Sequence, residues 1–384
     1  MKIERHLSIA DLQQSARRRL PASIYGYVSG AAEDHRTFAN NRAAFDRWML
    51  HPRMLTGVAQ RSQEVDLFGV RYSAPFGIAP MGLAGLCAHD GDLSLARAAA
   101  AERVPFVLSA ASTVPLETVA AAAPGSWYQG YLSADRATIA PLLARIASAG
   151  YRVLVVTVDV PVAAQRENEL RNGFSVPLRP SARLVLGGLA RPRWMVSTFA
   201  RTLATRGIPH FENFTAHRGG QIITGATGDH RNGRAALSWP DIAWIRSQWG
   251  GQLVIKGILR PDDARRAREA GADGIVVSNH GGRQLDGAIA TLDVLPAIAA
   301  AAGDLAVILD SGVRRGTDVL KALSLGARFV LIGRPAMYGL AVGGEAGVRH
   351  ALALLRREID VDLALVGCAR VEDLDRSFVT CGPF

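Results

Sequence analysis

Three segments of the chain share one pattern: S-A-G-Y-R-V-L-V-V-T (148–157), E-A-G-A-D-G-I-V-V-S (269–278) and S-L-G-A-R-F-V-L-I-G (324–333). In each segment a glycine follows a predicted helix, and an apolar run begins two or three residues later. Glycine tolerates the left-handed backbone that ends many helices. The short apolar run is typical of a parallel strand buried on both faces. The repeat therefore predicts alternating helices and parallel strands.

Short apolar runs of this kind occur eight times, at residues 75–80, 105–109, 127–131, 153–159, 253–256, 274–279, 306–310 and 329–333. Alanine-rich segments such as 92–103 and 261–270 supply helices between them. Eight such units predict an α/β fold, a (β/α)₈ TIM barrel, with a long insertion between strands four and five. An open doubly wound sheet is the alternative, but no G-x-G-x-x-G motif follows the first strand.

We expect a single domain over residues 1–384, with a helical extension at 1–70. Ser8 and Asp11 have the spacing of a capping box, and Pro21 ends that helix or opens the next. No apolar run approaches the roughly 20 residues of a spanning helix, and the N-terminus lacks the pattern of a signal peptide. Three widely spaced cysteines argue against a disulfide framework and a zinc site. We therefore expect a protein that works in a reducing cytosol and binds no metal ion.

The net charge of +10 comes mostly from arginine. Codon bias explains this excess as well as an anionic partner does, whether phosphate or a lipid surface. No nucleic-acid-binding motif is present, so we expect no nucleic-acid partner. A basic amphipathic insertion is predicted at 177–215, and its part 177–210 holds six arginines and no acidic residue. This insertion either packs on a neighbouring subunit or lies on a membrane surface.

Residues at the C-terminal ends of barrel strands surround the active site of such folds. The sixth apolar run leads into S-N-H-G-G-R-Q-L-D-G (278–287), where a histidine and an arginine share a glycine-rich turn. The polar residues at all these ends are Ser109, Gln129, Tyr131, Thr157, Asp159, Lys256, Ser278, His280, Arg283, Asp310 and Arg334. Two further turns, D-S-G-V-R-R-G-T-D (310–318) and I-G-R-P (332–335), join glycine and arginine to a helix start, which favours a phosphate site.

These motifs resemble those of the FMN-dependent 2-hydroxyacid dehydrogenases and oxidases. The resemblance runs nearly end to end and includes L-P-A-S-I-Y-G-Y-V-S-G-A-A-E-D (20–34), A-P-M-G-L (79–83), Y-Q-G-Y (128–131), T-V-D-V-P (157–161) and V-I-K-G-I-L (254–259). Within the family, it is nearest to the (S)-mandelate and bacterial L-lactate dehydrogenases. It implies FMN as cofactor and oxidation of an (S)-2-hydroxy acid, mandelate-like or lactate, to the 2-oxo acid.

The resemblance also implies the catalytic roles. His280 would take the substrate proton, and Asp159 would orient the imidazole and stabilise its protonated form. Arg283 and Arg166 would bind the substrate carboxylate, because a planar guanidinium can hold two oxygens at once. Tyr27 and Tyr131 would donate hydrogen bonds to the substrate; Tyr25 is a nearby alternative to Tyr27.

For the flavin, the resemblance assigns Lys256 to the region of N1, where it would stabilise the charge of the reduced ring. Ser109, Gln129 and Thr157 would bind the polar edge of the ring, and the backbone of Pro80, Met81 and Gly82 would approach N5. Ser278 would contact the ribityl side. The ribityl chain and phosphate would be held by Asp310, Ser311, Gly312, Val313, Arg314, Gly333 and Arg334.

Small residues at Gly82 and Ala111 favour a dehydrogenase with a roomy pocket and an aromatic substrate over lactate. Electrons would pass to a quinone or another acceptor; an oxidase that releases H₂O₂ is the alternative, and a flavin-binding scaffold without catalysis is a third possibility. The insertion resembles the membrane-binding segment of mandelate dehydrogenases. We therefore expect a peripheral homotetramer on the cytoplasmic side of the inner membrane, or otherwise a cytoplasmic protein.

Overall fold

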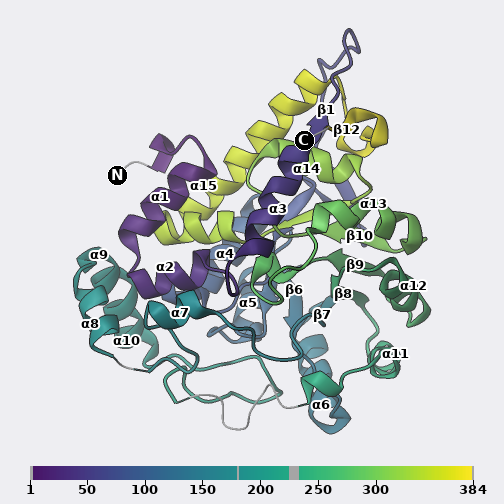
Figure 1. The fold of residues 1–384 in the computed structure, drawn as a ribbon. Helices are drawn as coiled ribbons and strands as arrows, with labels where there is room; N and C mark the ends of the chain where they lie inside the picture. The colour runs from purple at the N-terminus through teal and green to yellow at the C-terminus, as the bar shows by residue number, and fades with distance from the viewer. Residues whose placement is uncertain (1–2, 180, 225–232, 383–384) are drawn as a thin grey trace.

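The computed structural model describes residues 3–179, 181–224 and 233–382 (Figure 1). Its main sheet has eight parallel strands, in the order β4-β11-β10-β9-β8-β7-β6-β5. The strands are β4 (Phe76–Ile78), β5 (Val107–Ser109), β6 (Trp127–Gly130), β7 (Val153–Thr157), β8 (Gln252–Ile258), β9 (Gly274–Val277), β10 (Ala306–Leu309) and β11 (Phe329–Ile332). A parallel bridge between Ile78 and Phe106 brings the two ends of the sheet together. The predicted TIM barrel is confirmed: seven of the predicted apolar runs contain one strand each, and the run 253–256 lies within the longer strand β8.

Helices cover the outside of the barrel. They are α4 (Gly91–Ala101), α5 (Leu116–Ala122), α6 (Arg136–Ser148), α11 (Trp239–Gln248), α12 (Pro261–Glu269), α13 (Thr291–Ala302), α14 (Gly316–Ser324) and α15 (Arg334–Val366). The glycines of the repeated pattern have the expected left-handed backbone: φ is +87° at Gly150, +81° at Gly271 and +102° at Gly326. Each glycine thus turns the chain from a helix directly into the next strand.

The inside of the barrel is a core of its own. Inward-facing side chains such as Val155, Val254, Val276 and Ile308 are completely buried there. The hairpin β2 (Val65–Leu67) and β3 (Val70–Tyr72) adds to this core at the N-terminal ends of the strands. Its Tyr72 ring lies 5.7 Å from the Phe329 ring, and the Tyr72 hydroxyl accepts a hydrogen bond of 3.3 Å from Trp127 Nε1. The hairpin therefore closes the end of the barrel opposite to the predicted site.

The N-terminal extension is helical for a shorter stretch than the predicted 1–70. After the short 3₁₀ turn η1 (Ile3–Arg5), it forms α1 (Ile9–Arg19), α2 (Ala22–Ser29) and α3 (Arg36–Arg47). The chain then enters β1 (Trp48–Leu50), which pairs with the C-terminal strand β12 (Val379–Cys381). The capping box is confirmed, because Ser8 Oγ accepts from the Asp11 amide and Asp11 Oδ2 accepts from the Ser8 amide. Helix α1 packs against α15, and α3 packs against the turn at His280.

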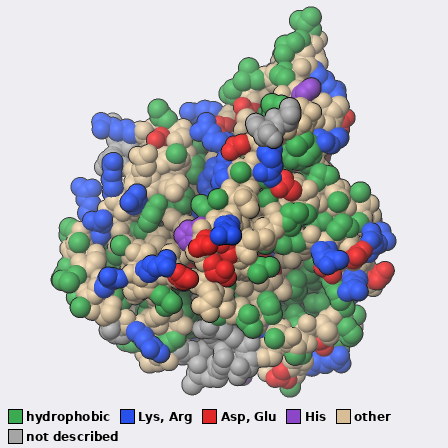
Figure 2. Space-filling view, viewed as in Figure 1, with side chains coloured by type: hydrophobic (Ala, Val, Ile, Leu, Met, Phe, Trp, Pro, Cys, Tyr) green, Lys and Arg blue, Asp and Glu red, His purple; other side chains and the backbone are tan. Residues whose placement is uncertain are grey.

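The insertion between β7 and β8 carries four short helical pieces beside α2 (Figure 1). They are α7 (Glu167–Arg171), α8 (Ala182–Leu189), α9 (Pro192–Trp194) with the π-helix η3 (Met195–Ala200), and α10 (Arg201–Arg206). Large apolar side chains are exposed on them: Val185, Leu186, Leu189, Val196, Phe199 and Leu203. Figure 2 shows hydrophobic and basic side chains mixed over this region. Within the described ranges, no helix is both long and apolar enough to cross a bilayer.

Two glycine substitutions test the helix-to-strand turns. At Gly150 an added Cβ meets open space, so Gly150→Ala should lower the free energy of unfolding by about 1–2 kcal/mol through backbone strain alone. At Gly326 the added Cβ would lie 2.7 Å from Ala299 Cβ, so Gly326→Ala should lower the free energy of unfolding by more than Gly150→Ala does. Urea unfolding measures both, and equal losses for the two variants would contradict the packing described at Gly326.

Candidate functional site

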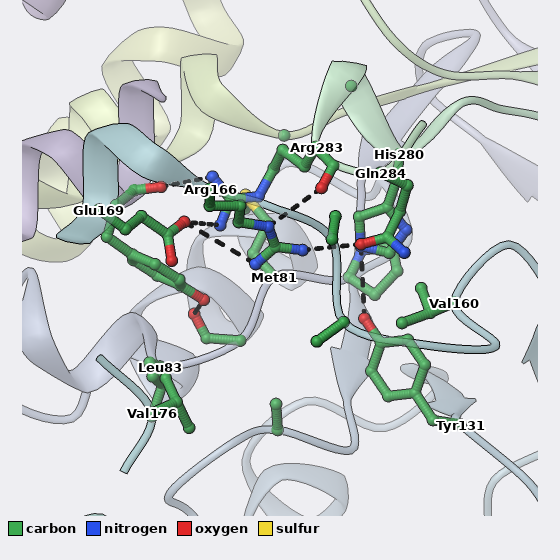
Figure 3. A pocket seen from close by; sticks show the side chains of 18 of the residues that line it. Met81, Leu83, Tyr131, Val160, Arg166, Glu169, Val176, His280, Arg283 and Gln284 are labelled. Atoms are coloured by element: carbon green, nitrogen blue, oxygen red, sulfur yellow. Dashed lines mark hydrogen bonds and ion pairs between the residues drawn. The ribbon is translucent and has the colours of Figure 1, made fainter. Parts of the chain in front are cut away.

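A cavity of about 460 Å³ opens at the C-terminal ends of the barrel strands (Figure 3). It is lined from nearly every strand end, by Met81 after β4, Tyr131 after β6, Lys256 in β8, His280 after β9, Asp310 after β10 and Gly333 after β11. The N-terminal extension adds Tyr27, and the segment after β7 adds Arg166. The structure thus gathers residues predicted from distant motifs around one space.

His280 is the centre of a short hydrogen-bonded chain. Its Nδ1 lies 2.9 Å from Asp159 Oδ1, and its Nε2 lies 3.4 Å from the Tyr131 hydroxyl. The pKa of His280 lies below its usual value: burial, the largest single cause, lowers it, the Asp159 carboxylate raises it, and the charges of Lys256 and Arg166 lower it. Burial by itself would raise the pKa of Asp159, but the charges of His280 and Lys256 lower it. The pair therefore consists of a neutral imidazole and an ionised carboxylate near neutral pH.

A left-handed turn holds His280 in the cavity. His280, Gly281 and Gly282 have φ values of +58°, +66° and +75°. A Cβ on Gly282 would lie 2.6 Å from the backbone nitrogen of Phe38 in α3. The turn is anchored by Ser278 Oγ, which accepts from the His280 amide, and by Ser311 Oγ, which accepts from the Gly281 amide. Glycine is required at Gly282 because α3 packs directly on the backbone.

Arg283 and Arg166 lie on the opposite side of the cavity and share an acidic neighbour (Figure 3). Arg283 Nη2 donates to Glu169 Oε1 over 2.9 Å, and Arg166 Nη1 lies 3.8 Å from the same oxygen. Arg166 also donates to the Arg283 carbonyl and to Gln284 Oε1. Burial lowers the pKa of Arg166, and the charge of Arg283 adds to this effect. Two cations in low-dielectric surroundings make this side of the cavity attractive to an anion.

Tyr27 reaches the cavity, whereas its sequence neighbour Tyr25 is not among the lining residues. The Tyr27 hydroxyl donates to the Gly82 carbonyl over 3.0 Å, and its ring stacks on Phe174. A Cβ on Gly82 would lie 2.8 Å from Ala111 Cβ. The small residues Gly82 and Ala111 therefore face each other, beside the Tyr27 hydroxyl.

Polar side chains buried next to the cavity carry unsatisfied atoms. Among the described residues, Gln129 Nε2 and Thr157 Oγ1 have no hydrogen-bond partner, although both side chains are buried. Ser109 Oγ donates to Gln129 Oε1. Buried polar atoms cost free energy when unpaired, so these atoms mark a place for a polar ligand. The neighbouring Lys256 is 3% exposed and forms an ion pair of 3.1 Å with Asp310 and a hydrogen bond of 2.8 Å with Ser278.

The turns after β10 and β11 bring together further predicted residues. Ser311 and Gly312 have φ values of +77° and +98°, and Val313 leads to the half-buried Arg314. Gly333 is the N-cap of α15, whose first residue is Arg334. Burial, the largest cause, and the charge of Arg314 together lower the pKa of Arg334 to about 9. Close guanidiniums at a helix N-terminus suit a phosphate group.

Arg334 has a structural task that sequence reasoning missed. Its guanidinium donates to the carbonyls of Val28, Gly30 and Gly281. Three of its five N–H groups therefore tie the N-terminal extension to the histidine turn.

The lining residues that were not predicted include Glu169, Gln284 and Arg234. Glu169 lies three residues after Arg166, a spacing that puts both on one face of a helical turn, and Gln284 directly follows Arg283. Arg234 places its guanidinium 4.5 Å from the Tyr131 ring, but it follows no motif that could have revealed it. Over the described part of the chain, no cluster of three or more His, Cys, Asp or Glu side chains is arranged to hold a metal ion.

Comparison with known proteins agrees with the geometry. A family model described as FMN-dependent dehydrogenase matches residues 16–381. The (S)-mandelate dehydrogenase of Pseudomonas putida is 39% identical over 97% of this chain and 93% of its own length, and the L-lactate dehydrogenase of Caulobacter vibrioides is 43% identical over 97% of each. A crystal structure described as monotopic membrane protein (S)-mandelate dehydrogenase superposes with a TM-score of 0.93 at 39% identity, covering 98% of this chain and 100% of the other. The chain belongs to the FMN-dependent 2-hydroxyacid dehydrogenase family.

Proposed function

We propose that the protein oxidises an (S)-2-hydroxy acid to the 2-oxo acid, with His280 as the base. The observation that carries this proposal is the neutral His280 imidazole, held by Asp159 and facing two guanidiniums across one cavity. A neutral imidazole can accept a proton at Nε2, and the Asp159 carboxylate stabilises the imidazolium that results. Hydride transfer and a carbanion intermediate require the same base, so the proposal holds for both.

The substrate carboxylate binds between Arg166 and Arg283, which retain N–H groups beyond those used within the protein. Tyr27 and Tyr131 donate hydrogen bonds to the bound acid. Tyr131 lies within 3.4 Å of His280 Nε2, which places the hydroxyl-bearing carbon of the substrate near the base. This orientation brings proton donor and acceptor together before the reaction.

The family uses FMN, and the residues present fit this group. The unsatisfied atoms of Gln129 and Thr157, with Ser109, suit the polar edge of a flavin ring. Lys256 would stabilise the charge of the reduced ring, Ser278 would contact the ribityl side, and the backbone of Pro80, Met81 and Gly82 after β4 would approach N5. Ser311, Gly312, Val313, Arg314, Gly333 and Arg334, with Asp310, would hold the ribityl chain and phosphate. FMN supplies the electron acceptor for the two electrons that leave the substrate.

The substrate side chain is apolar and bulky in our proposal. Gly82 and Ala111 line the cavity with small side chains, and Leu83, Val160 and Val176 add apolar surface (Figure 3). Burial of an aromatic ring against such surface is favourable, whereas a methyl group would leave part of the space unfilled. We therefore infer a preference for a mandelate-like acid over lactate.

We also propose that the exposed apolar side chains of α8 to α10 rest on the cytoplasmic surface of the inner membrane. A surface helix of this kind combines an apolar face with cations that attract anionic lipid. The mandelate dehydrogenase structure described as monotopic supports this proposal. Deletion of 178–208 would also remove Trp194, which is buried under α8, so point substitutions are the better test. The quinone acceptor and the homotetramer remain predictions.

Anaerobic reduction tests the reaction. We expect (S)-mandelate to bleach the bound flavin faster than L-lactate or glycolate, and His280→Gln to bind flavin and lose turnover by about 10²–10⁴-fold. Stopped-flow absorbance measures this, with His51→Gln, at an exposed position, as the control. A flavin that no 2-hydroxy acid bleaches, or a fully active His280→Gln, would refute the proposal. Release of H₂O₂ in step with the oxo acid under air would identify an oxidase.

The pH dependence follows from the lowered pKa of His280. Because only the neutral imidazole accepts the proton, kcat/KM should rise with pH and reach half its plateau below pH 6.5, the usual pKa of histidine. Asp159→Asn removes the charge that stabilises imidazolium, so the half-plateau point should move to lower pH while the plateau falls. Initial rates from pH 4.5 to 8 measure both effects. A midpoint that moves to higher pH in Asp159→Asn would contradict the assignment.

Membrane association depends on the exposed apolar residues of the insertion. Replacing Leu186, Leu189 and Val196 together with serine should move the protein from membrane pellet to supernatant and leave flavin reduction unchanged. A matched triple at Val70, Val361 and Leu365, exposed elsewhere, should stay with the membrane. Vesicle co-sedimentation gives the measurement. Equal distribution of both triples would contradict the proposal.

A further inference from the structure

Glu169 lies between the two guanidiniums that face the substrate (Figure 3). Its side chain is only 10% exposed, and its Oε1 contacts both Arg283 and Arg166. We propose that Glu169 selects substrates with a single carboxylate, because its charge cancels one of the two arginine charges. This inference rests on the proposed binding of the substrate carboxylate by Arg166 and Arg283.

The position of Glu169 is fixed by its own helix. Its amide donates to the Arg166 carbonyl over 2.9 Å, and its carbonyl accepts from the Phe174 amide over 2.8 Å. The Phe174 ring stacks on Tyr27, whose ring lies 4.9 Å from the Arg283 guanidinium. Glu169 is therefore part of the packed wall of the cavity and cannot swing out to solvent without disturbing that wall.

Hydrogen bonds of Arg283 show that Glu169 does more than anchor it. Arg283 Nη1 already donates to the carbonyls of Tyr27 and Gly30. These two bonds hold the plane of the guanidinium, and the Glu169 contact at Nη2 adds a third. Two of the five N–H groups remain for a substrate. A neutral acceptor at residue 169 would satisfy Nη2 equally well, so the distinctive contribution of a carboxylate is its charge.

The charge has a direct consequence for specificity. The two guanidiniums and Glu169 together leave one net positive charge, which one substrate carboxylate neutralises. A second carboxylate on the substrate would add a negative charge that meets no further cation from this group and lies near Glu169. At the distances and effective dielectric of a partly buried site, one such charge changes affinity by about tenfold or more. Glu169 thus acts as a specificity residue that does not itself bind the substrate.

The test compares two acids of similar size, L-lactate and 2-hydroxymalonate, which carry one and two carboxylates. We expect wild-type holoenzyme to bind lactate more tightly. Glu169→Gln keeps an oxygen that can accept from Arg283 and removes the charge, so the ratio of the two Kd values should shift by about tenfold toward the dianion. Glu169→Asp keeps the charge and should restore the wild-type ratio. Calorimetry on holoenzyme whose flavin is kept reduced, so that it cannot accept electrons from either acid, measures both Kd values without turnover.

A control removes a charge from the same helix outside the cavity. Glu167 is exposed and pairs with Arg171, so Glu167→Gln should leave the ratio unchanged. The inference would be overturned if Glu169→Gln left the ratio of the two Kd values unchanged, or if wild-type enzyme bound 2-hydroxymalonate more tightly than L-lactate. The comparison on wild-type enzyme does not depend on whether a variant folds. A wild-type flavin that no 2-hydroxy acid reduces would instead defeat the proposed function.

Discussion

The site depends on the docking of the N-terminal extension onto the turn that carries His280. Asn41 of α3 and Asn279 exchange two buried amide hydrogen bonds of 2.8 Å each, and Arg334 joins Val28 and Gly30 to Gly281. Buried polar groups of this kind are costly unless every partner is in place. The extension therefore docks in one register, and that register places Tyr27 beside Arg283 and presses α3 onto Gly282.

Charge is concentrated in the cavity, and the protein balances it locally. Lys256 is paired with Asp310, His280 with Asp159, and Arg283 with Glu169. The two members of each pair come from different strands or from the segments that follow them, so the barrel has to form before the pairs can assemble. The buried Arg334 and the half-buried Arg314 are close enough for each charge to affect the other, and this pair of cations favours an anion between them.

Much of this arrangement could be predicted from the sequence because it follows local rules. Eight short apolar runs, three of them within the glycine–strand repeat, predicted the eight strands. Strand ends in a parallel barrel share one rim, so His280, Lys256 and Asp310 were expected to lie near one another. Glu169, Gln284 and the structural bonds of Arg334 could not be predicted in the same way. Their roles depend on which donors point into the cavity after side chains pack, and spacing along the chain does not determine this. The extension was expected to be helical to residue 70, but Trp48–Leu50 forms a strand because its partner, Val379–Cys381, lies at the far end of the chain.

The hairpin β2–β3 gives the barrel the shape of a cup. Valine and isoleucine side chains fill the barrel axis, and its base is packed with Tyr72, Phe329 and Trp127. Among the described residues, the cavity therefore opens on the side of the rim. In the proposed reaction, the substrate, the oxo acid and the electron acceptor would all reach the site from this side. Such sharing would favour an ordered exchange, in which the oxo acid leaves before the acceptor approaches. Substitutions at the base of the cup can therefore change the stability of the barrel without disturbing the chemistry at the rim.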